Sequence, residues 1–244
     1  MQGETALHMA VCFEDVACIK KLMFNPKHPC NPRIYSNSNM SPLHLACREA
    51  DLEIVELIFH KIKAIEMKES LERLISDESP EGKQIKALCA AIGVRNLTSY
   101  TKHTSTLVKK LLNKAKEEGP DNYQATRVMI NKKFQKAMEE TDLKMQGHIN
   151  RAGEEKMTCL HLACKDGRVN VVDFLVCNKA DLSLKTAERE TCLHLSAHRG
   201  HLDVVKQLVD MGSPLEAKNL AGETSLHLAA KTDETDVIEF LIDS

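Results

Sequence analysis

Thr158-Cys159-Leu160-His161-Leu162-Ala163 and Thr191-Cys192-Leu193-His194-Leu195-Ser196 are two copies of one six-residue pattern, 33 residues apart. Three further copies begin at Thr5, Ser41 and Thr224. The step from Thr191 to Thr224 is again 33 residues, whereas the step from Thr5 to Ser41 is 36. A sequence that repeats at a period of this length predicts stacked copies of one small structural unit.

A second apolar set follows the pattern at matching offsets. In the units that begin at Ser41, Thr158, Thr191 and Thr224, the sets start at Ile54, Val171, Val204 and Val237. Their apolar residues fall at i, i+1, i+4 and i+5, which makes one stripe on a helix. The Leu and Ala residues of the six-residue pattern, called the hexad below, make a second stripe. We therefore predict two short antiparallel helices per unit, joined to the next unit by a turn.

The signature with its 33-residue period and the later Val-Val-x-x-Leu set resembles the ankyrin repeat. This resemblance covers residues 1 to about 60 and about 150 to 244, and it implies an all-α solenoid of antiparallel helix pairs with turn fingers. Departures from the family pattern are visible: its proline remains only at Pro42, and the glycine before the second helix remains only at Gly167 and Gly200. We therefore expect uneven stability along the stack.

We divide the chain into residues 1–60 with two clear units, a middle segment 61–148, and residues 149–244 with three clear units. The middle segment is either two degenerate repeats with long loops or a helical insertion. We favour degenerate repeats, because stacking through the middle would keep both apolar flanks covered. Residues 52 to about 75 are predicted to form one extended second helix.

Composition restricts the function classes. The chain of 244 residues has 43% hydrophobic residues but 4% aromatic ones and no Trp, which favours helix packing over a β-sandwich. Its net charge of -2 provides no global positive field for nucleic acid. Residues 61–148 hold 17 Lys plus Arg against 12 Asp plus Glu, so they are basic, whereas the flanks are acidic. The basic middle either guides partner docking or is a solvated helical face.

The titratable residues predict structure rather than catalysis. A catalytic group is needed once, but the histidine recurs in every unit, so we assign a structural role to His8, His44, His161, His194 and His227. An imidazole beside the capping hydroxyl can hold the turn through hydrogen bonds. No zinc spacing, phosphate loop or catalytic motif is present, so we predict no enzyme activity, no cofactor, no metal and no small-molecule substrate.

The turn fingers and the ends of the first helices form the surface that solenoids use for binding. The candidate protein-binding residues at these positions are Met40, Arg48, Glu49, Met157, Lys165, Asp166, His198, Arg199, Leu220 and Lys231. Met40, Met157 and Leu220 are expected to be exposed apolar contacts within a polar strip.

We expect a cytoplasmic interaction scaffold that binds protein, without nucleic acid and without direct membrane insertion. Apolar residues such as Leu226 and Ile238 persist in the last unit, where a polar cap is usual, so we expect a fragment of a longer array. The odd-length connections also resemble the cytosolic ankyrin regions of TRPA-type cation channels, which implies a possible tether to membrane segments outside this chain. A third alternative is the recognition region of an enzyme whose catalytic domain lies elsewhere.

Overall fold

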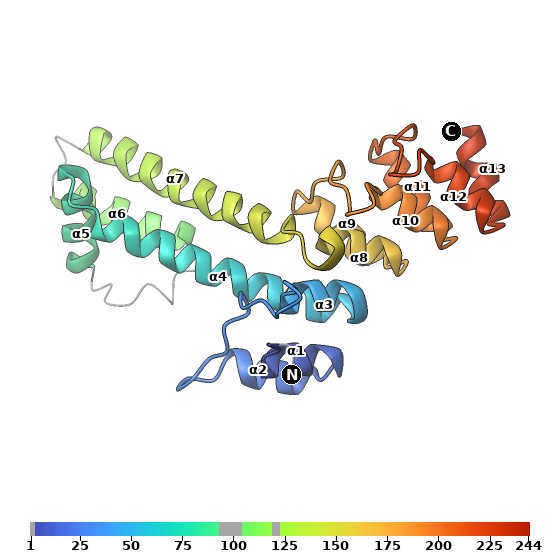
Figure 1. Ribbon diagram of the computed structural model, residues 1–244. Coiled ribbons are helices and arrows are strands. Elements are labelled where there is room, and N and C mark those ends of the chain that lie inside the picture. Colours follow the sequence, from blue (N-terminus) through green and yellow to red (C-terminus); the bar gives the residue numbers. More distant parts are fainter. Residues whose placement is uncertain (1–2, 93–103, 119–122) are drawn as a thin grey trace. The chain divides into compact units, whose positions relative to one another are not determined.

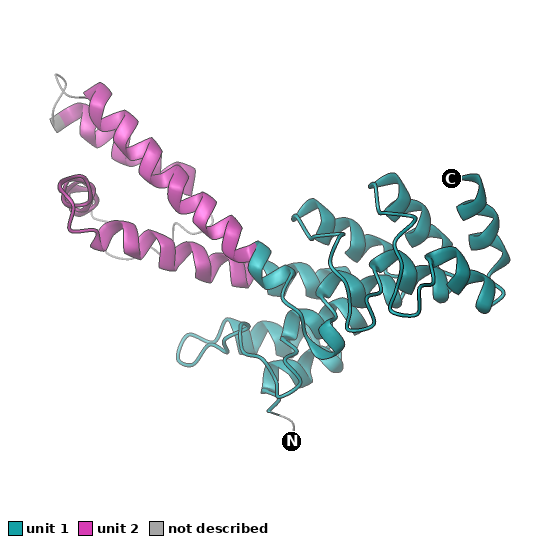
Figure 2. Cartoon of the chain, turned by 45° about the horizontal axis from the view of Figure 1, so that its top comes forward, with its two compact units in different colours: residues 1–59, 146–244 teal, residues 60–145 magenta. Residues whose placement is uncertain are grey.

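A computed structural model describes residues 3–92, 104–118 and 123–244, and its regular structure over these residues is helical (Figure 1). The all-α class is therefore confirmed. The chain divides into two compact units, unit 1 with residues 1–59 and 146–244 and unit 2 with residues 60–145 (Figure 2).

Unit 1 consists of helix pairs that follow the five hexads. Each hexad lies at the start of the first helix of a pair, and the second apolar set lies in the next helix. The first helices are α1 (Ala6–Cys12), α3 (Pro42–Glu49), α8 (Cys159–Lys165), α10 (Cys192–His198) and α12 (Ser225–Lys231). The second helices are α2 (Val16–Met23), the beginning of α4 (Leu52–Ser76), α9 (Val169–Cys177), α11 (Leu202–Asp210) and α13 (Thr235–Asp243).

The repeated Thr or Ser determines where each first helix begins. In α8, Thr158 has an extended backbone, and its hydroxyl accepts a hydrogen bond from the backbone N–H of His161. The imidazole Nδ1 of the same histidine in turn accepts the backbone N–H of Thr158. This reciprocal arrangement satisfies N–H groups that have no partner within the helix, so it fixes the start of a helix of only seven residues.

Glycine occupies the turn between the two helices in the third and fourth repeats. Gly167 and Gly200 both have a φ of +69°, a left-handed conformation that costs other residues free energy. A Cβ atom on Gly167 would lie 2.7 Å from the His201 ring, so the next repeat also approaches closely here. The two retained glycines suit both this conformation and the close approach of the next repeat, whereas Glu14 and Asp233 adopt the same left-handed conformation in the first and fifth repeats.

The second and third clear repeats are neighbours in unit 1, because α3 packs directly against α8. The favoured interpretation, a stack that continues through two degenerate repeats, is not the arrangement found. The hexads at Ser41 and Thr158 are 117 residues apart, which is 84 more than one period of 33. Direct packing of α3 on α8 covers both apolar flanks, so no intervening repeats are needed.

Unit 2 is a helical unit with its own core. It contains most of α4 and of α7 (Tyr123–Ile149), together with α5 (Pro80–Ala91) and α6 (Thr104–Glu118). The extended helix predicted over residues 52–75 is confirmed by α4. Twelve buried residues form the core: Met67, Leu71, Leu74, Ile85, Leu88, Cys89, Leu107, Leu111, Ala115, Ile130, Phe134 and Ala137. Burying these side chains together is the main favourable contribution to the stability of unit 2.

Candidate protein-binding surface

Histidines of the hexads link successive repeats of unit 1. The Nε2 atom of His8 lies 3.1 Å from the carbonyl oxygen of Met40, and that of His194 lies 3.1 Å from the carbonyl oxygen of Glu223. The rings of His44 and His161 bond the carbonyls of Arg151 and Leu184 in the same way. Each accepting carbonyl belongs to the loop before the next hexad, so the histidine holds the neighbouring finger in place.

These contacts define the tautomer of the ring. In the fourth repeat, Nδ1 of His194 accepts the N–H of Thr191 and lies 2.8 Å from its hydroxyl, so Nε2 carries the proton that is donated to the carbonyl. Burial lowers the pKa of His194, and it also lowers the pKa of His8. The neutral ring is therefore favoured at these two residues, whereas interactions with Cys159 and Cys192 raise the pKa of His44 and His161 in spite of their burial.

Arg168 joins the third repeat to the second. Its Nε and Nη1 atoms each lie 2.9 Å from a carbonyl oxygen, of Arg48 and Ala50 respectively, and Nη2 donates to the carbonyl of Glu49. These carbonyls end α3, where no helical N–H remains to bond them. His201 has the equivalent position one repeat later and bonds the carbonyl of Lys165. The sequence analysis did not predict that these side chains bond the end of the preceding first helix. Arg168 and His201 both lie ten residues after the capping Thr of their repeats, and comparing this position between repeats could have suggested a shared role.

The turn fingers are also connected to one another. The backbone N–H of Ala187 donates to the carbonyl of Glu155, and that of Leu220 donates to the carbonyl of Glu188, each at 2.8 Å. These two bonds are separated by 33 residues, so the finger contacts follow the repeat. They place Leu220 at a finger tip with 63% of its surface exposed, as expected.

The candidate residues at the first-helix ends lie on the surface in matching places. Lys165 ends α8 and Asp166 follows it, while His198 and Arg199 occupy the same positions at the end of α10. Asp166, His198 and Arg199 are exposed, and Lys165 is partly exposed.

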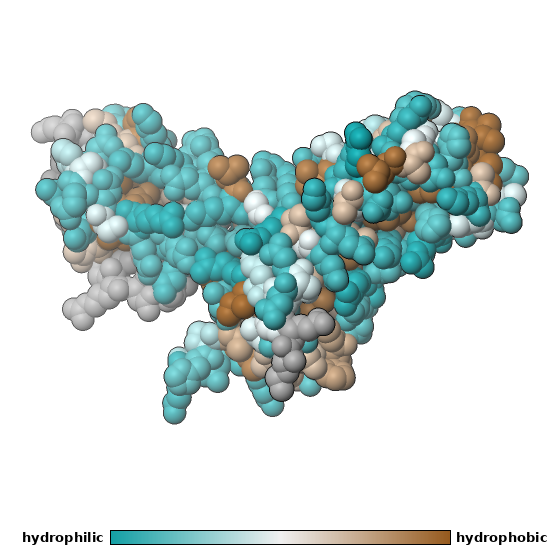
Figure 3. Space-filling model, in the orientation of Figure 1, coloured by the Kyte–Doolittle hydropathy of each residue, from teal (hydrophilic) through white to brown (hydrophobic). Residues whose placement is uncertain are grey.

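Three other candidate residues, Arg48, Glu49 and Lys231, already take part in ion pairs. Arg48 forms an ion pair with Glu49, and Lys231 forms one with Glu223 at 3.1 Å. The visible face of the molecule is mostly hydrophilic with separate small apolar areas (Figure 3). The surface that these repeats present is therefore polar, with charges of both signs.

Met40 and Met157 are not surface contacts, and the expectation that they are exposed is wrong. Only 3% of Met40 and 8% of Met157 is exposed. Both residues directly precede the capping Ser or Thr, where the chain turns against the previous repeat. A Cβ atom on Gly153 would lie 2.6 Å from the Met40 sulfur, which shows how closely this sulfur is packed. Leu220 lies four residues before its hexad, at Thr224, whereas Met40 and Met157 lie one residue before theirs. The position of Leu220 is the exposed finger tip.

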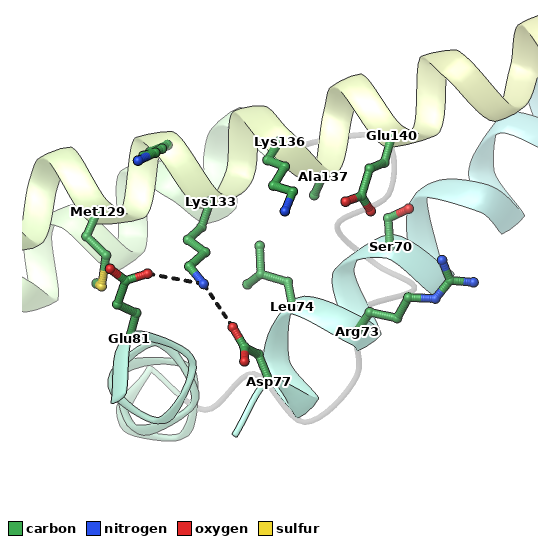
Figure 4. Close-up of a pocket in the computed structure, with 11 residues that line it drawn as sticks. Ser70, Arg73, Leu74, Asp77, Glu81, Met129, Lys133, Lys136, Ala137 and Glu140 are labelled. Atoms are coloured by element: carbon green, nitrogen blue, oxygen red, sulfur yellow. Dashed lines mark hydrogen bonds and ion pairs between the residues drawn. The ribbon is translucent and has the colours of Figure 1, made fainter. Parts of the chain in front are cut away.

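Unit 2 contains a cavity of about 420 Å³ between α4, α5 and α7. Lys133 points into it and bonds Asp77 at 2.9 Å and Glu81 at 3.1 Å (Figure 4). The hydrogen bond from Lys133 holds the pKa of Asp77 well below its usual range. Its other charged residues, Arg73, Lys132, Lys136 and Glu140, include both signs. Because the lining residues carry both positive and negative charges, they do not create an electrostatic potential of one sign in the cavity. The ion pairs of Lys133 instead connect the helices that surround it.

A family model described as ankyrin repeats, in three copies, matches residues 2–69 and 160–244. The chain belongs to the ankyrin-repeat family. Ankyrin repeats generally act as protein-protein interaction modules and are typically non-catalytic. A search of curated proteins found no match to this chain.

Among residues 3–92, 104–118 and 123–244, no group of three or more His, Cys, Asp or Glu side chains could hold a metal ion. The same residues contain no helix with the length and apolar character needed to span a membrane.

Proposed function

We propose that this ankyrin-repeat chain is a non-catalytic scaffold that binds a protein partner with the fingers and first-helix ends of unit 1. The charges at the ends of α8 and α10 support this most directly. Within the part of the chain that the structure describes, the side chains of Lys165, Asp166, His198 and Arg199 take part in no ion pair. Charged groups on consecutive repeats that are not used internally remain available to bond a partner.

Leu220 adds an apolar contact to this surface. It lies at a finger tip one repeat beyond Arg199 and is 63% exposed. An apolar side chain within a charged strip can be buried by a partner, while the surrounding charges select the partner and its orientation. The partner is therefore expected to present an apolar side chain together with acidic and basic groups.

A double charge reversal tests the proposal. Lys165→Glu together with Arg199→Glu should reduce capture of a partner that the wild type retains, as measured by quantitative mass spectrometry after pull-down. Lys206→Glu is the matched control, because Lys206 is an exposed cation on the second helix α11. Equal loss with both variants would indicate non-specific charge effects and would argue against this surface.

Two other contexts are compatible with the same surface. The repeats could form the cytosolic region of a TRPA-type cation channel, or the recognition region of an enzyme whose catalytic domain lies outside this chain. The full-length sequence separates them: six apolar spans of about 20 residues would favour the channel. A catalytic motif would favour the enzyme.

We also propose that unit 2 is an insertion within the repeat array. Its core residues come from residues 60–145 alone, and α3 packs on α8 as if no residues intervened. The 84 residues beyond one period correspond closely to this unit. In this view the insertion follows the second helix of the second repeat, where other repeats have a short turn.

A further inference from the structure

The cavity of unit 2 has an apolar floor with one buried hydroxyl. Leu74 of α4 and Ala137 of α7 belong to the core of the unit, and Ser70, which is 2% exposed, lines the cavity one helical turn before Leu74. The short side chain of Ala137 leaves space in front of this floor. A volume of about 420 Å³ that combines apolar surface with polar groups is typical of sites that bind small molecules.

The charged side chains around this floor form two sets. In the first set, Lys133 lies between Asp77 and Glu81, at 2.9 Å and 3.1 Å, so these three charges bond one another. Within residues 3–92, 104–118 and 123–244, the second set takes part in no ion pair; it consists of Arg73, Lys132, Lys136 and Glu140. Three cations and one carboxylate of the lining are therefore available to bond a ligand.

Lys136 and Glu140 lie four residues apart on α7, and both point toward α4 (Figure 4). Opposite charges at this spacing can pair, but the order with lysine first is the less favourable one on a helix. Instead of bonding each other, the two side chains leave an ammonium group and a carboxylate at the same cavity. A molecule that itself carries a carboxylate next to an ammonium group can bond both of them through charge-assisted hydrogen bonds.

We propose that this cavity is a binding site for a free acidic amino acid, a molecule with one ammonium group and two carboxylates. The ammonium group of the ligand donates to the carboxylate of Glu140, and its carboxylates accept hydrogen bonds from Lys136 and from Arg73 of the opposite helix, α4. The methylene groups of the ligand lie on Leu74 and Ala137. The ligand undergoes no reaction, and its binding does not depend on the protein-binding surface of unit 1.

The charges of the lining favour a ligand of this kind over a simple anion or a simple cation. Four cationic and three anionic side chains line the cavity, which gives a net charge of +1, and an acidic amino acid with its single negative net charge balances it. A phosphate ion would bring its charge against Glu140, whereas a simple amine would face the three unpaired cations. A molecule with charges of both signs satisfies both kinds of group.

Isothermal titration calorimetry of the whole chain tests the proposal. L-glutamate is titrated at constant ionic strength beside glutarate, which lacks the ammonium group, glutamine, which lacks the second carboxylate, and inorganic phosphate. L-aspartate, succinate and asparagine provide the same comparison with a shorter chain. We expect at least one of the two acidic amino acids to bind about tenfold more tightly than its analogues and phosphate, because each comparison removes a charge-assisted hydrogen bond. Absence of binding by both amino acids, or an equal affinity for the analogues or phosphate, would overturn the proposal.

Three variants locate the site. Glu140→Gln removes the acceptor of the ammonium group, so the preference for the amino acid over its dicarboxylate analogue should be lost. Lys136→Gln should weaken the binding of both by a similar factor of about ten. Arg127→Gln is the matched control, because Arg127 is an exposed cation on the same helix, outside the described lining of the cavity, and it should leave both affinities unchanged.

Circular dichroism checks that each variant keeps its helices. A loss of affinity in Arg127→Gln as large as that in Lys136→Gln would indicate a general charge effect and would refute the assignment of the site to this cavity.

Discussion

The ring of His44 bonds the backbone of Arg151 across 107 residues of sequence, with its Nε2 atom 2.9 Å from the carbonyl oxygen. The same contact joins repeats that are adjacent in sequence elsewhere in unit 1. The histidine contact between the second and third repeats is thus kept, although the residues of unit 2 lie between these repeats in the sequence.

Removal of unit 2 should leave the repeat array folded. We would delete residues 61–144 and change Gln146 to Gly, which restores the 33-residue step and supplies glycine where Gly212 has a φ of +82° in the fourth repeat. Circular dichroism should show a cooperative helical transition. As a control, the same deletion with Arg168→Ala should melt earlier. Loss of cooperative unfolding in the first variant would contradict the view that unit 2 is an insertion.

Arg168 should contribute strongly to the interface of the second and third repeats. Arg168→Ala leaves three carbonyls without their charged donor, and we expect a loss of about 2–4 kcal/mol in the free energy of unfolding, measured with urea. Arg168→His should lose less, because His201 bonds one such carbonyl at the equivalent position. Equal losses would show that the carbonyl contacts are unimportant.

A hexad histidine should contribute more to the free energy of unfolding when its ring bonds the loop before the next hexad than when it bonds only its own capping Thr. His194→Ala removes the inter-repeat bond to the carbonyl of Glu223, which keeps only the N–H of Asn219, whereas His227 is exposed and bonds its own Thr224. We expect His194→Ala to lower the unfolding free energy by about 1–2 kcal/mol more than His227→Ala. Thermal and urea unfolding of the two variants would be compared; the opposite order would refute a role for the inter-repeat bond.

Acid should weaken the fourth repeat through its buried neutral histidine, His194. The pKa of His194 is lowered by burial from its ordinary value of about 6.5. Below that value the unfolded chain binds a proton that the folded chain does not, so this contribution to stability is lost as pH falls through the folded-state pKa. NMR titration of the His194 ring should give a midpoint below 6.5. A midpoint at or above this value would be incompatible with the hydrogen bonds described.

Glycine substitutions should have opposite effects on stability at two positions of unit 1, Gly200 and Gly147. Gly200→Ala forces a Cβ onto a backbone with a φ of +69° and toward the carboxylate of Glu234, so we expect a loss of about 1–2 kcal/mol. Gly147→Ala meets no atom within 4 Å and lies inside α7, so it should stabilise the chain by about 0.5–1 kcal/mol. Chemical denaturation distinguishes these outcomes. An unchanged free energy of unfolding in Gly200→Ala would exclude strain at that turn.

The amino-acid sequence by itself determined the repeat, the helix pairs and the capping hydroxyls, because these depend on spacing within about 33 residues. It also identified Leu220 as an exposed tip and the long α4. Only the tertiary structure decided that α3 packs on α8 and that Met40 and Met157 are buried. These features depend on which repeats are neighbours in space, and a local pattern carries no information about contacts across the 84 extra residues.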